Sequence, residues 1–288
     1  MLPPISTDLV RWRLDVAYDG TAFSGWAAQP GLRTVEGDLG DWIGRVLHLA
    51  EPPRLTCAGR TDTGVHARGQ VVHVDLPAIS QTSRRGPQDT DTVLARRLPR
   101  ALPVDLVVRR VTQAPDGFDA RFSAIWRRYA YRLWDDPSDA DPLRRHHVVR
   151  HLDPLDVALL HEAGTDLLGL HDFVAFCKRR DQATTIRTLQ RVEAVRLPDR
   201  TIEVTIQADA FCHSMVRSLM GALTAVAAGR KDRAWLRSLL TLGRRAGDVT
   251  VLPAAGLTLE EVGYPNDADL AIRAAEARTT RSLPEDCP

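Results

Sequence analysis

Residues 57–70 read CAGRTDTGVHARGQ, the densest group of chemically active side chains in the chain. The segment joins two stretches with the composition and spacing of strands, residues 54–58 and 69–75. A loop between two strands of one sheet is held at both ends, and such loops commonly carry functional groups. The sequence therefore predicts a loop with polar side chains that is presented by a rigid sheet.

The loop contains an aspartate, Asp62, with Arg60 two residues before it and His66 four residues after it. A neighbouring guanidinium keeps a carboxylate ionised, which suits a nucleophile or a base. Glycines permit tight backbone paths and close approach of a ligand, and the loop holds Gly59, Gly64 and Gly69. By themselves these residues fit an active site and a hydrogen-bonded turn with a surface Asp–Arg pair about equally well.

A competing motif lies inside the loop, because residues 62–64 spell the Asp-Thr-Gly tripeptide of aspartic proteases. Those enzymes need two carboxylates that share one proton. No second Asp-Thr-Gly or Asp-Ser-Gly occurs in the chain, so only a symmetric dimer would supply the partner. The acid hydrolase is therefore disfavoured.

Composition fits a soluble globular protein of one large domain or two, with 288 residues, 44% hydrophobic and 26% charged. No apolar run approaches the roughly 20 residues that span a membrane, and the N-terminus lacks the pattern of a signal peptide. We therefore expect a cytoplasmic protein. A net charge of +1 does not indicate nucleic-acid binding. Arginine far outnumbers lysine, which suits phosphate contacts but is explained first by codon usage.

The sequence indicates no metal site and no disulfide. The cysteines, none of which forms a CxxC pair, are Cys57, Cys177, Cys212 and Cys287. Their spacing favours free thiols in a reducing compartment. Neighbouring His146 and His147 point to opposite sides if they lie on a strand, and they lack partner ligands.

Outward from the loop, strand and helix patterns alternate along both halves of the chain. In the first half we expect strands at 11–18 and 104–111, helices at 34–47 and 93–98, and a mobile surface loop at 79–92. In the second half we expect strands at 127–134, 189–197, 201–208 and 257–262 and helices at 154–168, 214–228 and 233–240.

This repeated pattern predicts an α+β fold of two similar α/β halves. We expect them to share an extended, mainly antiparallel sheet, with helices on one side and a catalytic cleft between the halves. The predicted organisation is an N-terminal half over 1–113, a C-terminal half over 114–265, and a tail over 266–288. The tail lacks an apolar stripe and is expected to be peripheral or disordered.

Three further motifs accompany the Asp62 loop in a fixed order. They are Tyr-Asp-Gly at 18–20, Arg-Tyr-Ala-Tyr at 128–131, and Phe-Cys-His-Ser-Met-Val-Arg at 211–217. With Ala-Gly-Arg-Thr-Asp-x-Gly-Val-His, this set closely resembles the tRNA pseudouridine synthase A family over roughly Leu14 to Tyr264. One departure is Ala27 after Trp26, where the family often has glutamine.

The resemblance implies an isomerase that converts uridine to pseudouridine in the anticodon stem-loop of tRNA, at positions 38, 39 and 40. It implies no cofactor and no metal, tRNA as partner, and a homodimer. The bond between ribose and the base nitrogen breaks, the uracil turns, and it rejoins through carbon. The carboxylate can attack the ribose anomeric carbon, add to the uracil ring, or remove a ribose proton, and all three routes need the uridine to leave the stack.

Residue by residue, the resemblance implies that Asp62 is the catalytic carboxylate. Tyr129 is expected to stack on the flipped uracil, Arg217 to form a buried ion pair with Asp62, and Arg60 to engage the RNA at the extruded uridine. Without the family, Tyr129 and Tyr131 are equivalent candidates, and Arg217 is a solvated or phosphate-binding arginine. His66 and Gln70 are expected to be structural, and the candidates for phosphate contacts are Arg121, Arg127 and Arg128.

Two alternatives stay open. One is the same chemistry on other uridines or another RNA, because substrate choice lies in loops and RNA shape. The other is a tRNA-binding module without essential catalysis, which the intact set of Arg60, Asp62, Tyr129 and Arg217 disfavours.

Overall fold

A computed structural model of the chain describes residues 9–77, 81–83, 86–178, 184–279 and 282. The described residues fall into two units. The first contains the chain up to Ala124 together with Tyr264–Arg278, and the second contains Ile125–Gly263. Each unit combines antiparallel strands with helices, which confirms the predicted α+β class.

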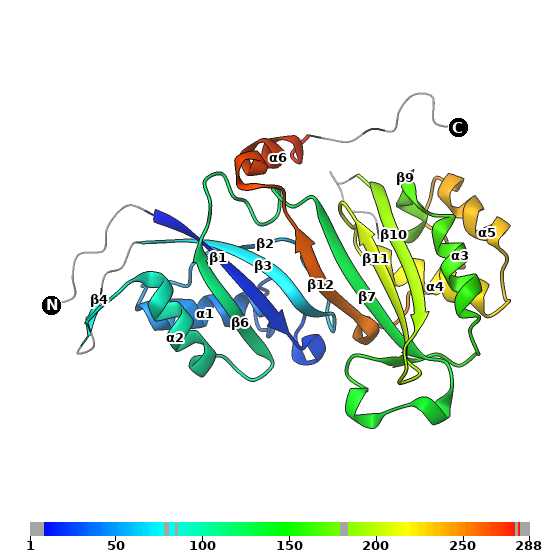
Figure 1. Cartoon of the computed structure of the whole chain (residues 1–288), viewed down its shortest axis with the longest axis horizontal. Helices are drawn as coiled ribbons and strands as arrows, with labels where there is room; N and C mark the ends of the chain where they lie inside the picture. The colour runs from blue at the N-terminus through cyan, green and yellow to red at the C-terminus, as the bar shows by residue number, and fades with distance from the viewer. Residues whose placement is uncertain (1–8, 78–80, 84–85, 179–183, 280–281, 283–288) are drawn as a thin grey trace. The chain divides into compact units, whose positions relative to one another are not determined.

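In the first unit the strand β1 (Leu9–Tyr18) pairs on both sides with antiparallel neighbours. Those neighbours are β3 (His66–Pro77) and β6 (Leu106–Gln113), and the short β2 (Leu55–Cys57) pairs with β3. Two helices, α1 (Val35–Leu47) and α2 (Thr90–Ala101), lie side by side along these strands (Figure 1). The Asp62 loop is therefore suspended between two paired strands, as the sequence predicts.

Local sequence explains where α1 begins and ends. The Thr34 hydroxyl accepts a hydrogen bond from the backbone N–H of Gly37 at 3.2 Å, the N-cap that the sequence predicts. The helix ends at His48, which adopts the left-handed conformation with φ 56°. Leu39 and Ile43 are fully buried, so the predicted apolar face is the packed one.

The segment 79–92 differs from the predicted mobile loop over its described residues. It contains a hairpin of β4 (Gln81–Ser83) and β5 (Gly86–Gln88), and α2 begins within it at Thr90. Part of the expected loop, residues 79–80 and 84–85, lies outside the described residues. Its polar composition hid the hairpin because a short strand of this kind has no apolar alternation to reveal it.

Within the predicted tail, Leu270–Glu276 forms the helix α6, which the sequence pattern did not predict. Leu270 and Ala274 are buried, and the Ser123 hydroxyl donates to the Leu270 carbonyl oxygen at 3.1 Å. These residues are therefore helical, although most of the side chains of α6 are exposed. The helix is too short for a stripe to register, and tertiary contacts stabilise it instead.

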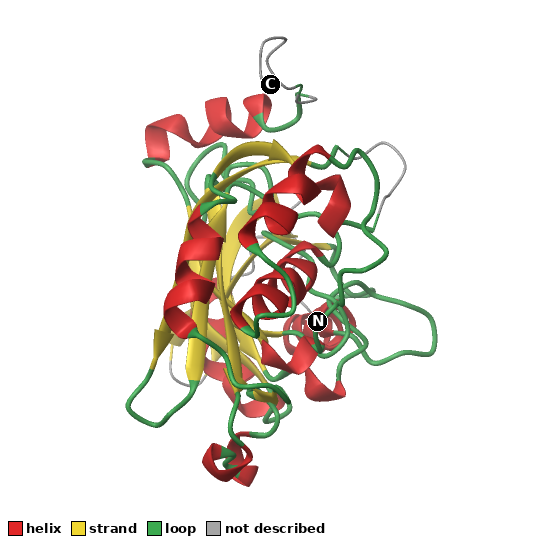
Figure 2. Ribbon diagram, turned by 90° about the vertical axis from the view of Figure 1, so that its right-hand side faces the viewer, coloured by secondary structure: helices red, strands yellow, loops and turns green. Residues whose placement is uncertain are grey.

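The second unit orders its strands β12 (Leu257–Gly263), β7 (Trp126–Trp134), β11 (Ile202–Ala208), β10 (Ile186–Arg196) and β9 (Gly169–Asp172). All these pairs are antiparallel, and β8 (Val149–Arg150) adds a short parallel pair to β7. The helices α3 (Val157–Thr165), α4 (Met215–Ala227) and α5 (Arg233–Ser238) lie together on one side of these strands (Figures 1 and 2). In β11, alternate residues from Ile202 to Ile206 are buried, which confirms the predicted half-buried strand.

Helix α4 is the centre of the second unit, since nearly every residue along it is buried. Gly221 permits the backbone of Thr250 to press against the helix, because a Cβ at Gly221 would lie 1.7 Å from the Thr250 carbonyl oxygen. The segment after Thr250 is thereby held against the first turns of α4. No helix among the described residues is long and apolar enough to cross a membrane.

Candidate active site

The Asp62 loop is a tight turn between β2 and β3. The Val65 N–H donates to the Asp62 carbonyl oxygen at 3.1 Å, and Gly64 adopts φ 78°, a conformation that favours glycine. Thr61 is buried, Asp62 is half-buried, and Arg60 is exposed. The turn therefore presents the Asp62 carboxyl group at the boundary between the protein interior and solvent.

A second loop, residues 19–26 after β1, packs directly on the backbone of the Asp62 loop. The Trp26 N–H donates to the Thr61 carbonyl oxygen at 3.0 Å. A Cβ at Gly20 would lie 2.1 Å from the Val65 carbonyl oxygen, and one at Gly25 would lie 3.0 Å from the Thr61 carbonyl oxygen. The two loops thus touch backbone to backbone, which fixes the path of the chain on either side of Asp62.

His66 and Gln70 occupy the structural positions expected of them. Nδ1 of His66 accepts a hydrogen bond from the backbone N–H of Gly20 at 3.0 Å. The Gln70 side chain engages both backbone groups of Gly59, donating to its carbonyl oxygen at 2.7 Å and accepting from its N–H at 3.4 Å. Both side chains are buried in the first unit.

Tyr129 lies on β7 in the second unit and is only 7% exposed. The ring of Phe211 meets it edge to face, with ring centroids 5.1 Å apart. Phe211 belongs to the loop that leads into α4, so this loop supports the tyrosine ring. Pattern reasoning did not single out Phe211, although its place in the third motif is a usable signal.

Arg217 is the third residue of α4, and its guanidinium is anchored by a neighbouring loop. Its Nε donates to the Leu252 carbonyl oxygen at 2.7 Å, and the Leu252 N–H donates to the Arg217 carbonyl oxygen at 3.2 Å. The Tyr131 hydroxyl donates to the Pro253 carbonyl oxygen at 2.8 Å and so holds the same loop. Burial raises the pKa of Tyr131, and the positive charge of Arg217 opposes that rise.

The arginines expected to contact phosphate have different environments. Arg121 is exposed, and its guanidinium lies over the Phe122 ring. Arg128 forms an ion pair with Glu261 on the neighbouring strand. Arg127 is 8% exposed and donates to the Asp209 carbonyl oxygen at 2.7 Å, so its environment suits a structural role. A strand pattern alone does not show which side of the sheet an arginine faces.

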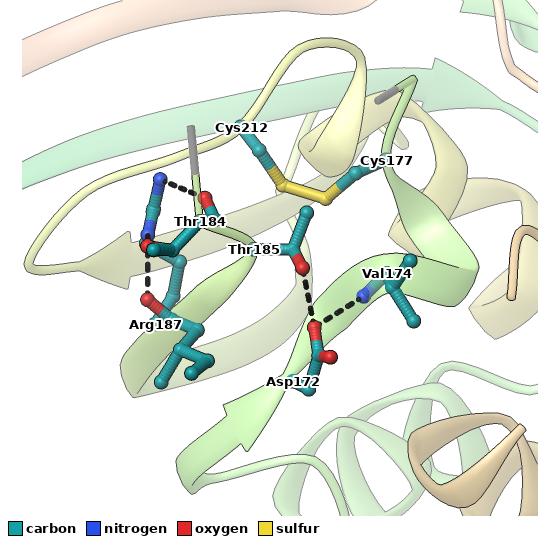
Figure 3. Close-up of a disulfide and its surroundings, with 8 residues drawn as sticks. Asp172, Val174, Cys177, Thr184, Thr185, Arg187 and Cys212 are labelled. Carbon is teal, nitrogen blue, oxygen red and sulfur yellow. Dashed lines mark hydrogen bonds between the residues drawn. A yellow bond between two sulfur atoms is a disulfide. The ribbon is translucent and has the colours of Figure 1, made fainter. Parts of the chain in front are cut away.

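The free-thiol prediction is wrong for two cysteines, because Cys177 and Cys212 form a disulfide with Cα atoms 5.8 Å apart (Figure 3). The bond joins the end of a 3₁₀ helix after β9 to the loop that carries Phe211. Their wide separation in sequence concealed the pairing. Cys57 is free, as predicted, and it is also buried, which raises the pKa of its thiol to about 12. Cys287 lies outside the described residues.

Side chains around the disulfide hold the same corner of the second unit. The Val174 N–H donates to the Asp172 carboxylate at 3.0 Å, and the Thr185 hydroxyl donates to that carboxylate as well (Figure 3). These bonds tie the end of β9 to the start of β10. Among the described residues, no group of three or more His, Cys, Asp or Glu side chains is arranged to hold a metal ion.

The candidate catalytic residues are thus divided between the units. Arg60 and Asp62 share one loop of the first unit, while Tyr129 and Arg217 belong to β7 and α4 of the second. Within the second unit, the loop before α4 supports Tyr129 through Phe211 and leads directly to Arg217. Each half of the predicted set is therefore held by its own framework.

Known proteins similar to this chain agree with the motifs. A family model described as tRNA pseudouridine synthase matches residues 163–265. The tRNA pseudouridine synthase A of Cutibacterium acnes is 59% identical over 281 residues, covering 97% of this chain and 98% of that protein. Those of Streptomyces griseus and Mycobacterium leprae are 51% and 50% identical, over 96% and 97% of this chain and 95% and 98% of their own.

Among solved structures, a Cbf5-Nop10-Gar1 complex matches 74% of this chain and 44% of its own, with 12% identity. The TM-score of this match is 0.34. The sequence relatives, in contrast, are similar over nearly the full length of both chains. This chain therefore belongs to the tRNA pseudouridine synthase A family, isomerases that convert uridine to pseudouridine in tRNA.

Proposed function

We propose that the protein isomerises uridines 38, 39 and 40 in the anticodon stem-loop of tRNA, with Asp62 as the catalytic carboxylate. The observation that carries this proposal is the way the loop is held. Backbone contacts fix the chain immediately before and after Asp62, while the residue itself stays half-buried rather than covered. A carboxylate fixed at the edge of solvent is suited to meet a base that swings out of an RNA helix.

We further propose that Arg217 pairs with Asp62 when the two units form a common cleft over a shared sheet. Arg217 lies in the first turn of α4, where the helix dipole disfavours a positive charge. No acidic residue lies in that first turn to compensate. The ionised Asp62 carboxylate has the charge that complements both the Arg217 guanidinium and the N-terminus of α4.

Tyr129 is proposed to stack on the flipped uracil, with Phe211 holding the ring in place. Arg60 is proposed to contact the RNA where the uridine leaves the stack, since its side chain is exposed two residues from Asp62. Of the other arginines, Arg121 and Arg128 stay candidates for phosphate contacts, whereas the burial of Arg127 counts against that role.

The proposed reaction conserves all atoms of the uridine. The bond from ribose C1′ to uracil N1 breaks, the base turns, and a bond from C1′ to C5 forms. The proton on C5 leaves and N1 gains one, so the product is an isomer and no cofactor takes part in the balance. Asp62 serves either as nucleophile, at C1′ or on the ring, or as the base that removes a ribose proton. We also propose a homodimer acting in the cytoplasm.

The test is pseudouridine mapping on unmodified tRNA incubated with the purified protein, with and without the Asp62→Asn substitution. The variant keeps the shape of the side chain and removes its charge, so product is expected to vanish while tRNA binding persists. Asp41→Asn is the matched control, because Asp41 is an exposed aspartate on α1 of the same unit. The control is expected to keep the wild-type rate.

Each outcome separates the proposal from its alternatives. Product at positions 38 to 40, lost in Asp62→Asn alone, supports the reaction, the substrate and the residue together. Product at other uridines would move the proposal to a different RNA target. Tight tRNA binding without any pseudouridine would favour a binding module, and normal turnover by Asp62→Asn would remove Asp62 from the chemistry.

A further inference from the structure

A chain of buried hydrogen bonds runs from β3 to the residue before Asp62. It involves Gln70 on β3, Tyr18 at the end of β1, and Thr61 in the loop. We propose that the Tyr18 hydroxyl and the Gln70 carboxamide are positioning groups that set the location of the Asp62 carboxylate. This inference rests on the proposed catalytic role of Asp62.

The Gln70 side chain pairs with both backbone polar groups of Gly59, as the backbone of a neighbouring strand would. Its Nε2 donates to the Gly59 carbonyl oxygen at 2.7 Å, and its Oε1 accepts from the Gly59 N–H at 3.4 Å. A carboxamide carries a donor and an acceptor side by side, so it can complete both bonds, whereas a carboxylate has no donor. Gln70 is 0% exposed, so any bond it loses is not replaced by bulk water.

Tyr18 extends this clamp towards the catalytic residue. Its phenol oxygen accepts from Nε2 of Gln70 at 3.3 Å and shares a hydrogen bond with the Thr61 hydroxyl at 2.7 Å. The Tyr18 ring is itself held by Phe23 and Trp26, with centroids 6.3 Å away in each case. The packed ring therefore holds the Tyr18 hydroxyl in a fixed position.

Thr61 links Tyr18 to the position of Asp62, because it is hydrogen-bonded at two places. Its hydroxyl is bonded to Tyr18, and its carbonyl oxygen accepts from the Trp26 N–H at 3.0 Å. The next residue along the backbone is Asp62, so a rotation of Thr61 swings the carboxylate. A displacement of about 1 Å at a reacting group can cost on the order of 100-fold in rate. Loss of the Tyr18 hydroxyl is thus expected to reduce turnover without changing the affinity for RNA.

The primary experiment compares Tyr18→Phe with wild type in single-turnover pseudouridine formation and in tRNA binding. We expect the rate constant at saturating enzyme to fall by about 10- to 100-fold, while the Kd for tRNA changes by less than about twofold. A merely structural residue would lower activity in proportion to the unfolded fraction, which thermal denaturation measures.

Tyr264→Phe is the matched control, because it removes a hydroxyl in the same unit that is bonded equally well. The Tyr264 hydroxyl donates to the Ala120 carbonyl oxygen at 2.7 Å, and neither residue belongs to the loops around Asp62. This variant is expected to keep the wild-type rate constant even if its melting temperature falls. Equal losses of rate in Tyr18→Phe and Tyr264→Phe would contradict the proposal.

Conservative rescue at Thr61 tests the hydroxyl pair directly. Thr61→Ser keeps the hydroxyl and is expected to stay near the wild-type rate, whereas Thr61→Val removes it and is expected to match Tyr18→Phe. Because the two hydroxyls share one bond, the double variant Tyr18→Phe, Thr61→Val is expected to lose little more than either single variant. Independent, multiplying losses would show that the bond between them is not what matters.

Gln70→Met removes both bonds to Gly59 while keeping the length of the side chain. We expect a larger fall in melting temperature than in Tyr18→Phe, together with a reduced rate in the folded fraction. Asp62→Asn serves as the reference throughout. If Asp62→Asn retains turnover, the proposed function fails; if Asp62→Asn is inactive and Tyr18→Phe turns over normally, only the positioning role fails.

Discussion

At the scale of single residues, the Asp62 loop shows what can be predicted from residue types alone. The motif around it predicts a functional loop, and the structure confirms a turn held between β2 and β3. The groups that hold the loop were not predictable, because Tyr18 reaches Thr61 across 43 positions of sequence. Long-range hydrogen bonds of this kind depend on strand register, which sequence spacing does not encode.

For Tyr129, residue type and spacing alone were not enough to choose the candidate. The resemblance distinguishes it from Tyr131, whereas alternation along the strand does not. In the structure the two tyrosines have different partners, since Tyr129 packs on Phe211 while the Tyr131 hydroxyl holds the Pro253 carbonyl oxygen. The structure therefore places the Tyr129 ring against another aromatic ring and gives the Tyr131 hydroxyl a backbone partner.

The Tyr129→Phe variant separates the ring from the hydroxyl. Phenylalanine keeps the edge-to-face contact with Phe211, so tRNA affinity is expected to stay within about twofold of wild type. If the hydroxyl handles a proton, the rate constant is expected to fall by about 100-fold or more. Rapid-quench measurement of pseudouridine formation checks this, and an unchanged rate would reduce Tyr129 to a stacking surface.

At the scale of elements, long periodic segments were predictable and short ones were not. The apolar face of α1 and the alternation of β11 follow from residue spacing alone. By contrast, β4, β9 and α6 are too short to show a period. The disulfide also escaped prediction, because it joins two separate elements across 35 positions.

This disulfide predicts that the stability of the second unit depends on redox conditions. Closing a loop of this length stabilises the folded state by about 4 kcal/mol in the chain-entropy model. A dithiol reductant is therefore expected to lower the melting temperature of the wild-type protein. The double variant Cys177→Ala, Cys212→Ala is expected to have a lower melting temperature than wild type without reductant. Its melting temperature is not expected to change when the reductant is added.

Cys57→Ala provides the control, since Cys57 is free and buried. It is expected to remain sensitive to the reductant in the same way as wild type. Thiol counting by mass spectrometry after alkylation of unreduced, denatured protein gives an independent check. Alkylation of Cys177 and Cys212 without reductant would contradict the cross-link in solution.

At the scale of the whole molecule, the first unit is assembled from two distant parts of the chain. Tyr264–Arg278 returns to it after the chain has completed Ile125–Gly263. Leu270 is 2% exposed, and a Cβ at Gly117 would lie 2.6 Å from the Cβ of Ala271. The repeated strand and helix patterns indicated two α+β halves, but they did not reveal this return, because the segment lacks an apolar stripe.

Leu270→Ala tests whether α6 completes the first unit. Truncation of a buried leucine costs about 2–5 kcal/mol, and hydrogen exchange is expected to accelerate in β1 and β6 more than in β10 and β11. Ile272→Ala is the matched control, because Ile272 lies on the same helix and is 61% exposed. It is expected to change stability by no more than about 0.5 kcal/mol. Equal effects of the two variants would show that α6 is not packed as described.

The interrupted first unit has a consequence for the order in which the protein is made. A ribosome synthesises every residue of Ile125–Gly263 before it reaches α6. Domains generally fold as units during synthesis once their segments have emerged. The second unit can therefore complete its fold before the first unit does. The first unit, which contains the Asp62 loop, is complete only after α6 has been synthesised. The unit that carries the Asp62 loop therefore receives its last segment, α6, only after the whole of the second unit has been synthesised.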